Sequence, residues 1–234
     1  MRLPEHQIYR GPTDDYEDPT RRAAIDAHWR SLPLSGLVET RISYQLQHAD
    51  IPSFFRPVSF SLLRQRWQEI PEVMAACEEF AATGFANGKP GLLLVGPPGT
   101  GKTSLAIATL RGTLEAIRGN RPAHFWKVAA GLNRIRESFS RSSESADTSG
   151  PAESVLDLLA NYLVVLDDLG QERVTEWAHD QLYTLIDALL ERERKVIVTS
   201  NAGPETWQLS EALRSRVSGM CDIHLLGGTD WRSQ

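Results

Sequence analysis

A glycine-rich loop between an apolar run and a helical pattern constrains the fold of this chain more than any other stretch. Residues 91–104 read GLLLVGPPGTGKTS and match the pattern G-x-x-x-x-G-K-[ST]. Because glycine has no Cβ, backbone N–H groups can crowd around phosphate oxygens there, and the helix that follows adds its positive N-terminal end. The stretch therefore predicts a phosphate-binding loop of the kind that holds a nucleotide.

The side chains of this loop also suit a nucleoside triphosphate with Mg²⁺. Lys102 supplies a mobile charge for the β- and γ-phosphates, and Thr103 offers the hard oxygen that Mg²⁺ requires. The alternative is a Gly/Pro turn that happens to precede a lysine, but the flanking strand and helix patterns weigh against it. The predicted nucleotide-binding residues are Gly96, Pro97, Pro98, Gly99, Thr100, Gly101, Lys102, Thr103 and Ser104.

Length and composition fit one α/β domain with an appendage. The chain has 234 residues and a net charge of −5, which does not by itself indicate a nucleic-acid-binding protein. Its two cysteines, Cys77 and Cys221, fit no zinc or redox spacing and are expected to be reduced and buried, and the histidines share no metal-ligand spacing. No apolar run is as long as a membrane span and no signal peptide is evident, so we expect a cytoplasmic protein without a membrane partner.

Strand-like and helix-like patterns alternate from the loop onward. Short apolar runs predict strands at residues 92–95, 123–128, 162–166, 195–199 and 222–226. Helical patterns are found from Pro71, at 102–117, at 130–139, from Pro151, at 175–191 and from Ser210. This alternation predicts a parallel sheet covered by helices on both faces. The polar residues 140–150 are expected to form a mobile surface loop.

Residues 1–55 are less regular than the rest of the chain. Proline, aspartate, arginine and histidine alternate there with scattered apolar residues, and only 20–32 and 42–47 have helical or short-element patterns. We expect a small helical or partly disordered arm that docks on a partner, with a tail that has no partner as the alternative. The segment IPSFFRPVSF, which begins at Ile51, either wraps an adenine ring or plugs the edge of the core. We predict an ATPase domain at 56–234.

Two acidic residues end one of the buried strands. Asp167 and Asp168 follow the apolar run LVVL. Asp167 is placed to hold Mg²⁺, directly or through water, and Asp168 to orient or deprotonate an attacking water. An ordinary strand end with two solvated acids is the alternative, which the phosphate-binding loop upstream disfavours.

Three more polar residues follow the next buried strand. Asn201 could donate a hydrogen bond to the γ-phosphate or the attacking water, although, taken by itself, an asparagine at the start of a turn explains it better. Arg214 and Arg216, in LRSRV, carry permanently charged guanidinium groups that suit a phosphate in the transition state. They act as arginine fingers if they enter a neighbour's nucleotide site. Surface salt bridges to Glu205 or Glu211 are the alternative.

A basic stretch lies between these motifs. Residues 111–144 contain seven basic and three acidic residues, a local net charge of +4. Such a stretch is compatible with a contact to nucleic-acid phosphates. A solvated helix face explains it equally well.

Together the motifs resemble the DnaC/IstB branch of AAA+ ATPases, which comprises bacterial and phage helicase loaders and transposition helper ATPases. The resemblance covers residues 51–232, through IPSFFRPVSF, GPPGTGKTS, VVLDDLGQERVTEW, VIVTSN and LRSRVSGMCDIHLLGGTDWR. Asp-Asp followed by Leu-Gly-x-Glu, in place of the usual AAA+ Asp-Glu, is typical of this branch.

The resemblance implies a fold and a set of roles. The fold would be a P-loop NTPase with an AAA+ core, in which helices flank a five-stranded parallel sheet of order 5-1-4-3-2, and no C-terminal lid follows. Walker A would be 96–103, with Thr103 and Asp167 as metal ligands. The implied catalytic residues are Lys102, Asp168, Asn201 as sensor 1, Arg216 as the finger offered to a neighbouring subunit, and Arg214 second to it.

The resemblance also implies a function. The expected protein is an ATPase that uses ATP and Mg²⁺, forms a ring or spiral homo-oligomer and loads a replicative helicase onto single-stranded DNA. One alternative is a transposition helper ATPase that acts on duplex DNA and a transposase. Another is a nucleotide-switched adaptor with little turnover, and a small-molecule kinase is the weakest. The arm has no cysteine cluster, so a zinc-binding N-terminal domain is not expected.

Overall fold

The computed structural model describes residues 34–66, 70–144, 154–170 and 175–227. The chain divides into two units, Met1–Thr40 and Arg41–Gln234. Helix α2 (Leu34–His48) begins in the first unit, and the helix expected at 20–32 lies outside the described residues. The N-terminal arm expected at 1–55 stays a prediction. Within the second unit, Phe125 N donates a hydrogen bond to Ala49 O at 2.7 Å, which ties residue 49 to the core of that unit.

A parallel sheet lies at the centre of the second unit. Its strands are β1 (Gly91–Val95), β2 (Ala123–Lys127), β3 (Leu163–Asp167), β4 (Lys195–Ser200) and β5 (Cys221–Leu225). They lie in the order β2-β3-β4-β1-β5 and all neighbours pair in parallel. Counted from the other edge this is the order 5-1-4-3-2, so the predicted fold is confirmed.

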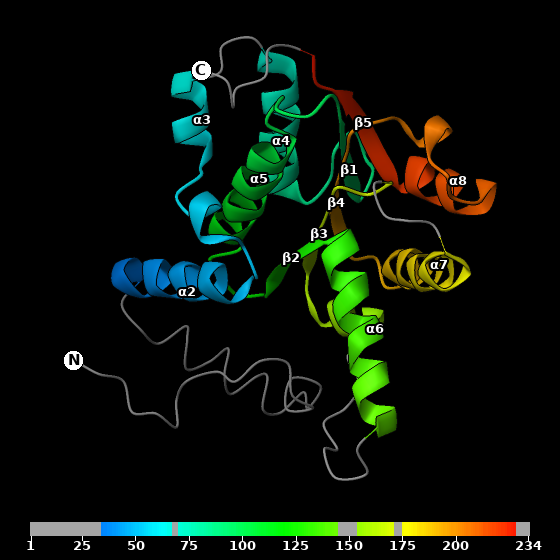
Figure 1. The fold of residues 1–234 in the computed structure, drawn as a ribbon. Coiled ribbons are helices and arrows are strands. Elements are labelled where there is room, and N and C mark those ends of the chain that lie inside the picture. Colours follow the sequence, from blue (N-terminus) through cyan, green and yellow to red (C-terminus); the bar gives the residue numbers. More distant parts are fainter. Residues whose placement is uncertain (1–33, 67–69, 145–153, 171–174, 228–234) are drawn as a thin grey trace. The chain divides into compact units, whose positions relative to one another are not determined.

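Helices cover both faces of the sheet. They are α3 (Phe60–Arg66), α4 (Pro71–Thr83), α5 (Lys102–Ala116), α6 (Val128–Glu144), α7 (Glu176–Glu191) and α8 (Glu211–Met220), with short 3-10 helices η3 (Ser53–Phe55), η4 (Val155–Ala160) and η5 (Pro204–Thr206). Figure 1 shows α4 and α5 on one side of the sheet and α7 and α8 on the other. Among the described residues, no helix combines the length and the apolar character needed to cross a bilayer.

The strand sequences explain this layering. Leu92 and Leu94 contribute to the core under α4 and α5, whereas Leu93 contributes to the core under α7 and α8. Because successive side chains of a strand point to opposite faces, a central strand that is buried on both faces reads as a continuous apolar run. Strand β5 lies at an edge, and there Ile223 and Leu225 are 40% and 74% exposed.

Two segments differ in detail from the sequence-based expectation. Helix α6 extends to Glu144, so residues 140–144 are helical where we expected a mobile loop, and 145–150 lie outside the described residues. The one glycine of the helix, Gly131, lies in its first turn, and neither glycine nor proline follows it before Glu144. The short helix expected from Pro151 is the 3-10 helix η4, whose first turn is closed by a capping box between Ser154 and Asp157.

The segment before α4 closes the edge of the core. Ile51 and Val58 are buried, and Phe55 and Phe60 pack against the same core cluster, whereas Phe54 is 84% exposed. Apolar side chains in this position remove core surface from water. Of the two roles considered for the segment, the structure therefore shows the packing role.

Candidate nucleotide-binding site

The glycine-rich loop joins the carboxyl end of β1 to the first turn of α5. Gly99 and Gly101 have φ of 84° and 85°, a left-handed conformation that favours glycine. At Gly96, a Cβ would lie 2.3 Å from the backbone oxygen of Leu226, which is too close for any side chain. The loop therefore requires glycine at these positions, and β1, paired on both sides with β4 and β5, holds it at the carboxyl edge of the sheet.

Lys102 is folded back against this loop. Lys102 is only 5% exposed, and its Nζ donates hydrogen bonds to the backbone oxygens of Gly96 at 2.7 Å and Pro97 at 2.8 Å. Burying an ammonium group is costly unless its donors are satisfied. The contacts therefore keep a positive charge inside the curve of the loop, where the phosphates of a nucleotide are expected.

Asp167 lies beside the loop at the end of β3. It is 3% exposed, and Oδ1 accepts hydrogen bonds from Thr103 Oγ1 at 2.9 Å and from Thr199 Oγ1 at 2.8 Å. Burial raises the pKa of Asp167, the hydrogen bond from Thr199 opposes that rise, and the nearby Asp168 carboxylate adds to it. The fold thus brings together Thr103 and Asp167, the two residues that the sequence assigned to the metal.

Asp168 leaves the strand with a sharp turn. Its φ is 60°, and its backbone N–H is bound by Thr199 Oγ1 at 2.9 Å. The side chain is 30% exposed, and Oδ2 lies 3.5 Å from the ammonium nitrogen of Lys127 at the end of β2. Asp168 therefore has a fixed backbone and a partly solvated carboxylate next to a cation.

Sequence reasoning missed Thr199 and Lys127. Thr199 is fully buried in β4, and its hydroxyl connects the Asp167 carboxylate with the backbone of Asp168. A buried hydroxyl within a run of aliphatic residues needs a partner, and that was the signal in the sequence. Lys127 is the charged residue that ends the strand next to β3, so its place is evident only once the strand order is known.

The remaining candidate residues lie at different places. Asn201 directly follows β4 and is half-buried, and within the described residues its side-chain amide has no hydrogen-bond partner. Arg214 and Arg216 lie on α8, and in the described part of the chain neither makes a polar contact with the phosphate-binding loop. Arg214 Nη1 donates to the backbone oxygen of Glu205 at 3.0 Å. Arg216 pairs with Asp187, not with Glu205 or Glu211 as considered from the sequence.

The oxygen donors beside the loop fit a Mg²⁺ ion. A hydroxyl and a carboxylate, from Thr103 and Asp167, lie within 2.9 Å of each other. Mg²⁺ is usually bound by one or two carboxylates together with water and substrate phosphates. Among the described residues no group of three or more His, Cys, Asp or Glu side chains is arranged to hold a metal ion. The donor set therefore suits an ion that enters with the nucleotide.

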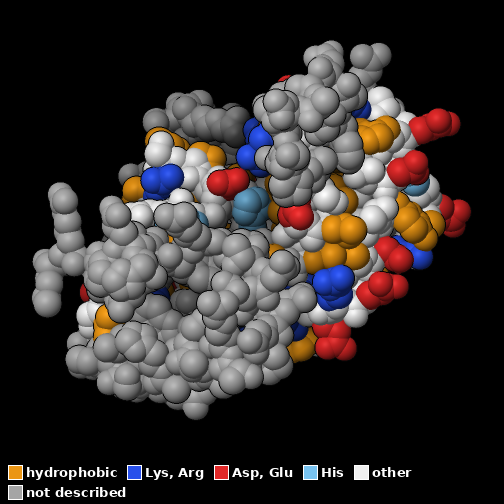
Figure 2. All heavy atoms as spheres, turned by 90° about the horizontal axis from the view of Figure 1, so that it is seen from below, with side chains coloured by type: hydrophobic (Ala, Val, Ile, Leu, Met, Phe, Trp, Pro, Cys, Tyr) orange, Lys and Arg blue, Asp and Glu red, His pale blue; other side chains and the backbone are white. Residues whose placement is uncertain are grey.

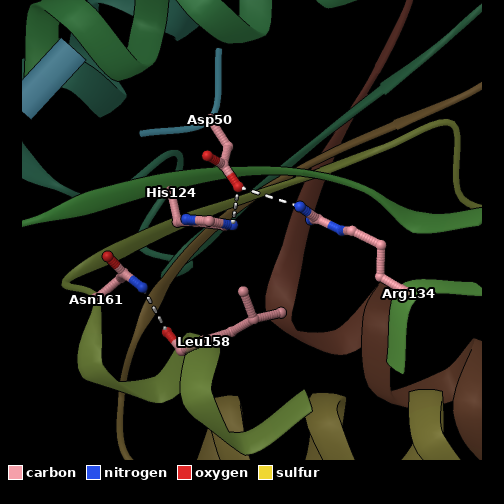
Figure 3. A network of polar contacts seen from close by, with 5 residues as sticks. All are labelled: Asp50, His124, Arg134, Leu158 and Asn161. Atoms are coloured by element: carbon pink, nitrogen blue, oxygen red, sulfur yellow. Dashed lines mark hydrogen bonds and ion pairs between the residues drawn. The ribbon is translucent and has the colours of Figure 1, made fainter. Parts of the chain in front are cut away.

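A separate polar network lies at the outer strand β2. Asp50 Oδ2 is 3.7 Å from His124 Nε2 and 3.5 Å from Arg134 Nη1 (Figure 3). Burial lowers the pKa of His124, Asp50 opposes that change, and Arg134 adds to it. Arg134, one of the cations of the basic stretch, therefore faces a carboxylate of its own chain.

Other cations of the basic stretch also have partners within the chain. Arg111 Nε donates to the backbone oxygen of Val58 at 2.9 Å, and the guanidinium of Arg136 lies 4.7 Å from the ring centre of Trp177. Figure 2 shows acidic and basic side chains of the described residues interspersed on the visible part of one face. Three cations of the stretch, Arg111, Arg134 and Arg136, thus contact groups of their own chain.

Comparison with known proteins adds a family to this geometry. The family described as IstB-like ATP binding protein matches residues 69–232. The cell division cycle protein 48 homolog of Archaeoglobus fulgidus is 30% identical over 173 residues, which make up 66% of this chain and 22% of that protein. The chain spans about a fifth of the length of the curated relatives it matches first, with shares of 17% and 22%.

Solved structures share the fold at low sequence identity. The DnaC helicase loader has a TM-score of 0.63 and 21% identity, covering 75% of this chain and 100% of that one. The replication initiator DnaA bound to AMPPCP and single-stranded DNA has a TM-score of 0.59 and 16% identity, covering 74% and 50%. Because the family match spans more than half of the chain and includes the loop, Asp167 and Arg216, the chain belongs to the family of IstB-like ATP binding proteins.

Proposed function

We propose that this chain hydrolyses ATP between assembled copies of itself and thereby loads a replicative helicase onto single-stranded DNA. The observation that carries the proposal is the separation of two sets of residues. Lys102, Thr103 and Asp167 form one connected group at the carboxyl edge of the sheet. Arg216 lies on α8 and is bound to α7. A guanidinium that stabilises transferred phosphate would therefore come from a second copy.

Within each copy, the residues have distinct tasks. Lys102 would bind phosphate oxygens, and Thr103 and Asp167 would hold Mg²⁺, which neutralises phosphate charge when bound. The Asp168 carboxylate would orient the attacking water and take its proton. Thr199 fixes the backbone from which that carboxylate extends. The amide of Asn201 would donate a hydrogen bond to the γ-phosphate or the water.

Assembly is tested by turnover measured at increasing protein concentration. We expect turnover per chain to rise with concentration, and Arg216→Ala to lower it about 1000-fold, the effect typical of a finger residue. ATP affinity should stay within about threefold, because a group outside the chain's own loop acts on the transition state. Arg64→Ala, which removes an ion-paired arginine on α3, is the matched control. Turnover that is independent of both concentration and Arg216 would refute the proposal.

The proposed client is supported by the relatives. This chain covers all of the DnaC helicase loader chain, and the similar DnaA structure contains single-stranded DNA. We propose that the N-terminal arm docks on the helicase and that exposed cations of the basic stretch contact DNA phosphates. Binding to single strands would then be tolerant of sequence and would weaken steeply with salt. An Asp168→Asn chain, stalled with its partner, should retain the helicase in a pull-down from native lysate.

A second client is favoured by the family itself. The matching family is described as IstB-like. The DnaC/IstB branch that the sequence resembles includes transposition helper ATPases, which act on duplex DNA and a transposase. The ATPase measured with single-stranded and duplex DNA of the same length and sequence separates the two clients. Stronger stimulation by single strands supports helicase loading, whereas stronger stimulation by duplex supports the transposition role. No binding or stimulation by either DNA at low salt would refute both.

A further inference from the structure

Two residues of α7 hold the guanidinium of Arg216. Arg216 Nε donates a hydrogen bond to Asp187 Oδ1 at 2.8 Å, and the guanidinium carbon lies 4.6 Å from the ring centre of Tyr183. A planar guanidinium stacks on an aromatic ring while its nitrogens bind acceptors at the edge of the plane. These contacts fix both the position and the plane of the group.

The same contacts leave the outer end of the guanidinium available. Only Nε is used by Asp187, and within the described residues neither Nη1 nor Nη2 of Arg216 has a hydrogen-bond partner. The Arg216 side chain is 32% exposed, and that of Asp187 is 40% exposed. The two Nη atoms form the pair of parallel donors that binds phosphate or carboxylate in a bidentate manner. The fold therefore presents a fixed donor pair that its own chain does not fill.

The sequence of α7 accounts for this arrangement. Tyr183 and Asp187 are four positions apart, so they lie on the same face of the helix, one turn from each other. Helices α7 and α8 lie next to each other on one side of the sheet (Figure 1). A ring and a carboxylate on one helix thus receive one arginine from the other.

We propose that Asp187 and Tyr183 are positioning residues that orient Arg216 before it enters the nucleotide site of a neighbouring copy. The proposal rests on the proposed function, in which Arg216 acts in that site. A long side chain that is already held loses less freedom when it binds phosphate. Assembly then delivers an oriented donor pair instead of a mobile cation.

The alternative is an ion pair that only stabilises the packing of α7 against α8. Exposed ion pairs add little to stability, so removing Asp187 should leave the chain folded. A purely structural pair acts through the stability of the chain that carries it. A positioning pair acts on turnover at the interface to which that chain offers Arg216, while the chain stays equally stable, so turnover and thermal unfolding together separate the two roles.

The test uses mixtures of two inactive chains. The donor carries Lys102→Ala, so it lacks its own nucleotide site but offers Arg216. The acceptor carries Arg216→Ala, so it binds ATP but offers no finger. Mixing them should restore turnover at interfaces where a donor meets an acceptor. Asp187→Asn is then added either to the donor or to the acceptor, and Asp180→Asn, on the same helix and 75% exposed, is the matched control.

We expect Asp187→Asn in the donor to lower the restored turnover roughly tenfold or more, because a loosened group no longer meets the transition state in the right orientation. In the acceptor it should change turnover by less than about twofold. Tyr183→Leu in the donor should lower turnover less than Asp187→Asn does, and Tyr183→Phe, which keeps the ring, should preserve it. Thermal unfolding of each variant checks that the chain stays folded.

Three results would contradict these expectations in different ways. An active mixture in which donor Asp187→Asn has no effect, or the same effect as acceptor Asp187→Asn, overturns the positioning role alone. A loss of turnover with donor Asp180→Asn equal to that with Asp187→Asn overturns it too. If the Lys102→Ala donor and the Arg216→Ala acceptor, both with Asp187 intact, stay inactive when mixed, the action of Arg216 between copies is overturned. The positioning role is then overturned with it.

Discussion

The carboxyl edge of the sheet and the α7–α8 pair both hold charged side chains, but they satisfy those charges differently. At the sheet, Lys102 and Asp167 are 5% and 3% exposed, and each has two close hydrogen-bond partners within the chain. On the helices, the side chains of Arg216 and Asp187 are 32% and 40% exposed, and Arg216 uses one nitrogen of three. The charged groups of the first region are satisfied within the chain, whereas the second region has donors to offer.

The difference follows from how each region is built. Register between parallel strands fixes residues at neighbouring strand ends, so distant parts of the chain can satisfy each other's polar groups in a buried place. The packing of two helices with solvated outer faces fixes fewer side-chain positions than strand register does, and it leaves part of a charged group in water. Changes at the sheet edge should therefore affect every chain by itself, and changes on the helices only assembled chains.

Among the changes at the sheet edge, Lys102→Ala should have the largest effect on ATP binding, and it should act on the isolated chain. Its removal takes away the ammonium group that the loop holds against Gly96 and Pro97, so ATP affinity should fall about 100-fold or more, since hydrogen bonds to charged groups are the strong ones. Titration calorimetry with ATP and Mg²⁺ measures this at concentrations where the chain is monomeric. Unchanged affinity would place the nucleotide elsewhere.

Asp168→Asn should separate binding from hydrolysis. The amide keeps the size of the side chain but cannot take a proton from water, so turnover should fall about 100-fold or more while ATP affinity changes little. Steady-state turnover and equilibrium binding on the same preparation test this. Equal losses in both quantities would assign Asp168 to binding. Full turnover in the variant would favour the nucleotide-switched adaptor.

Thr199→Val should affect both stability and turnover, because one hydroxyl serves both acids. The substitution keeps the shape of the side chain but removes a donor to Asp167 and an acceptor for Asp168 N. We expect the free energy of unfolding to fall by about 1–3 kcal/mol, the cost of leaving buried polar groups unsatisfied. Turnover should fall about tenfold through the displaced acid. Thr206→Val on η5, an exposed position, is the control in urea unfolding, and an equal change in both variants would contradict the role of Thr199.

The fold and the loop could be predicted because they depend on local patterns. Continuous apolar runs marked the strands, and the spacing of Gly96, Gly101 and Lys102 marked the phosphate-binding loop. The order of the strands came from the resemblance to a family, since periodicity alone does not say which strands pair. Residues 140–144 were misjudged because a serine-rich stretch lowers helix propensity without ending a helix.

Contacts between distant residues could not be predicted in the same way. Thr199 and Lys127 join the site only through the pairing of β3 with β4 and with β2, which brings their ends to one edge. Likewise the sequence offered Glu205 and Glu211 as acids near α8, but packing of α8 beside α7 supplies Asp187 instead. Which polar groups meet is decided by register and helix packing, and neither can be read from local spacing.

The smallest expected effect is a change in the free energy of unfolding, caused by the burial of the Asp167 carboxylate. Burial raises the pKa of Asp167 above its ordinary value of 3.8, so the folded chain binds that proton more tightly than the unfolded chain does. By linkage, this group lowers stability as pH rises from 3.8 through the raised pKa, and the loss persists at neutral pH. Asp167→Asn should therefore raise the free energy of unfolding of the nucleotide-free chain near pH 7, by about 0.5–2 kcal/mol as for other strained functional positions. Urea unfolding from acidic to neutral pH, with Asp180→Asn as the exposed control, measures the difference. An Asp167→Asn chain that is less stable at neutral pH would show that the hydrogen bonds from Thr103 and Thr199 outweigh burial.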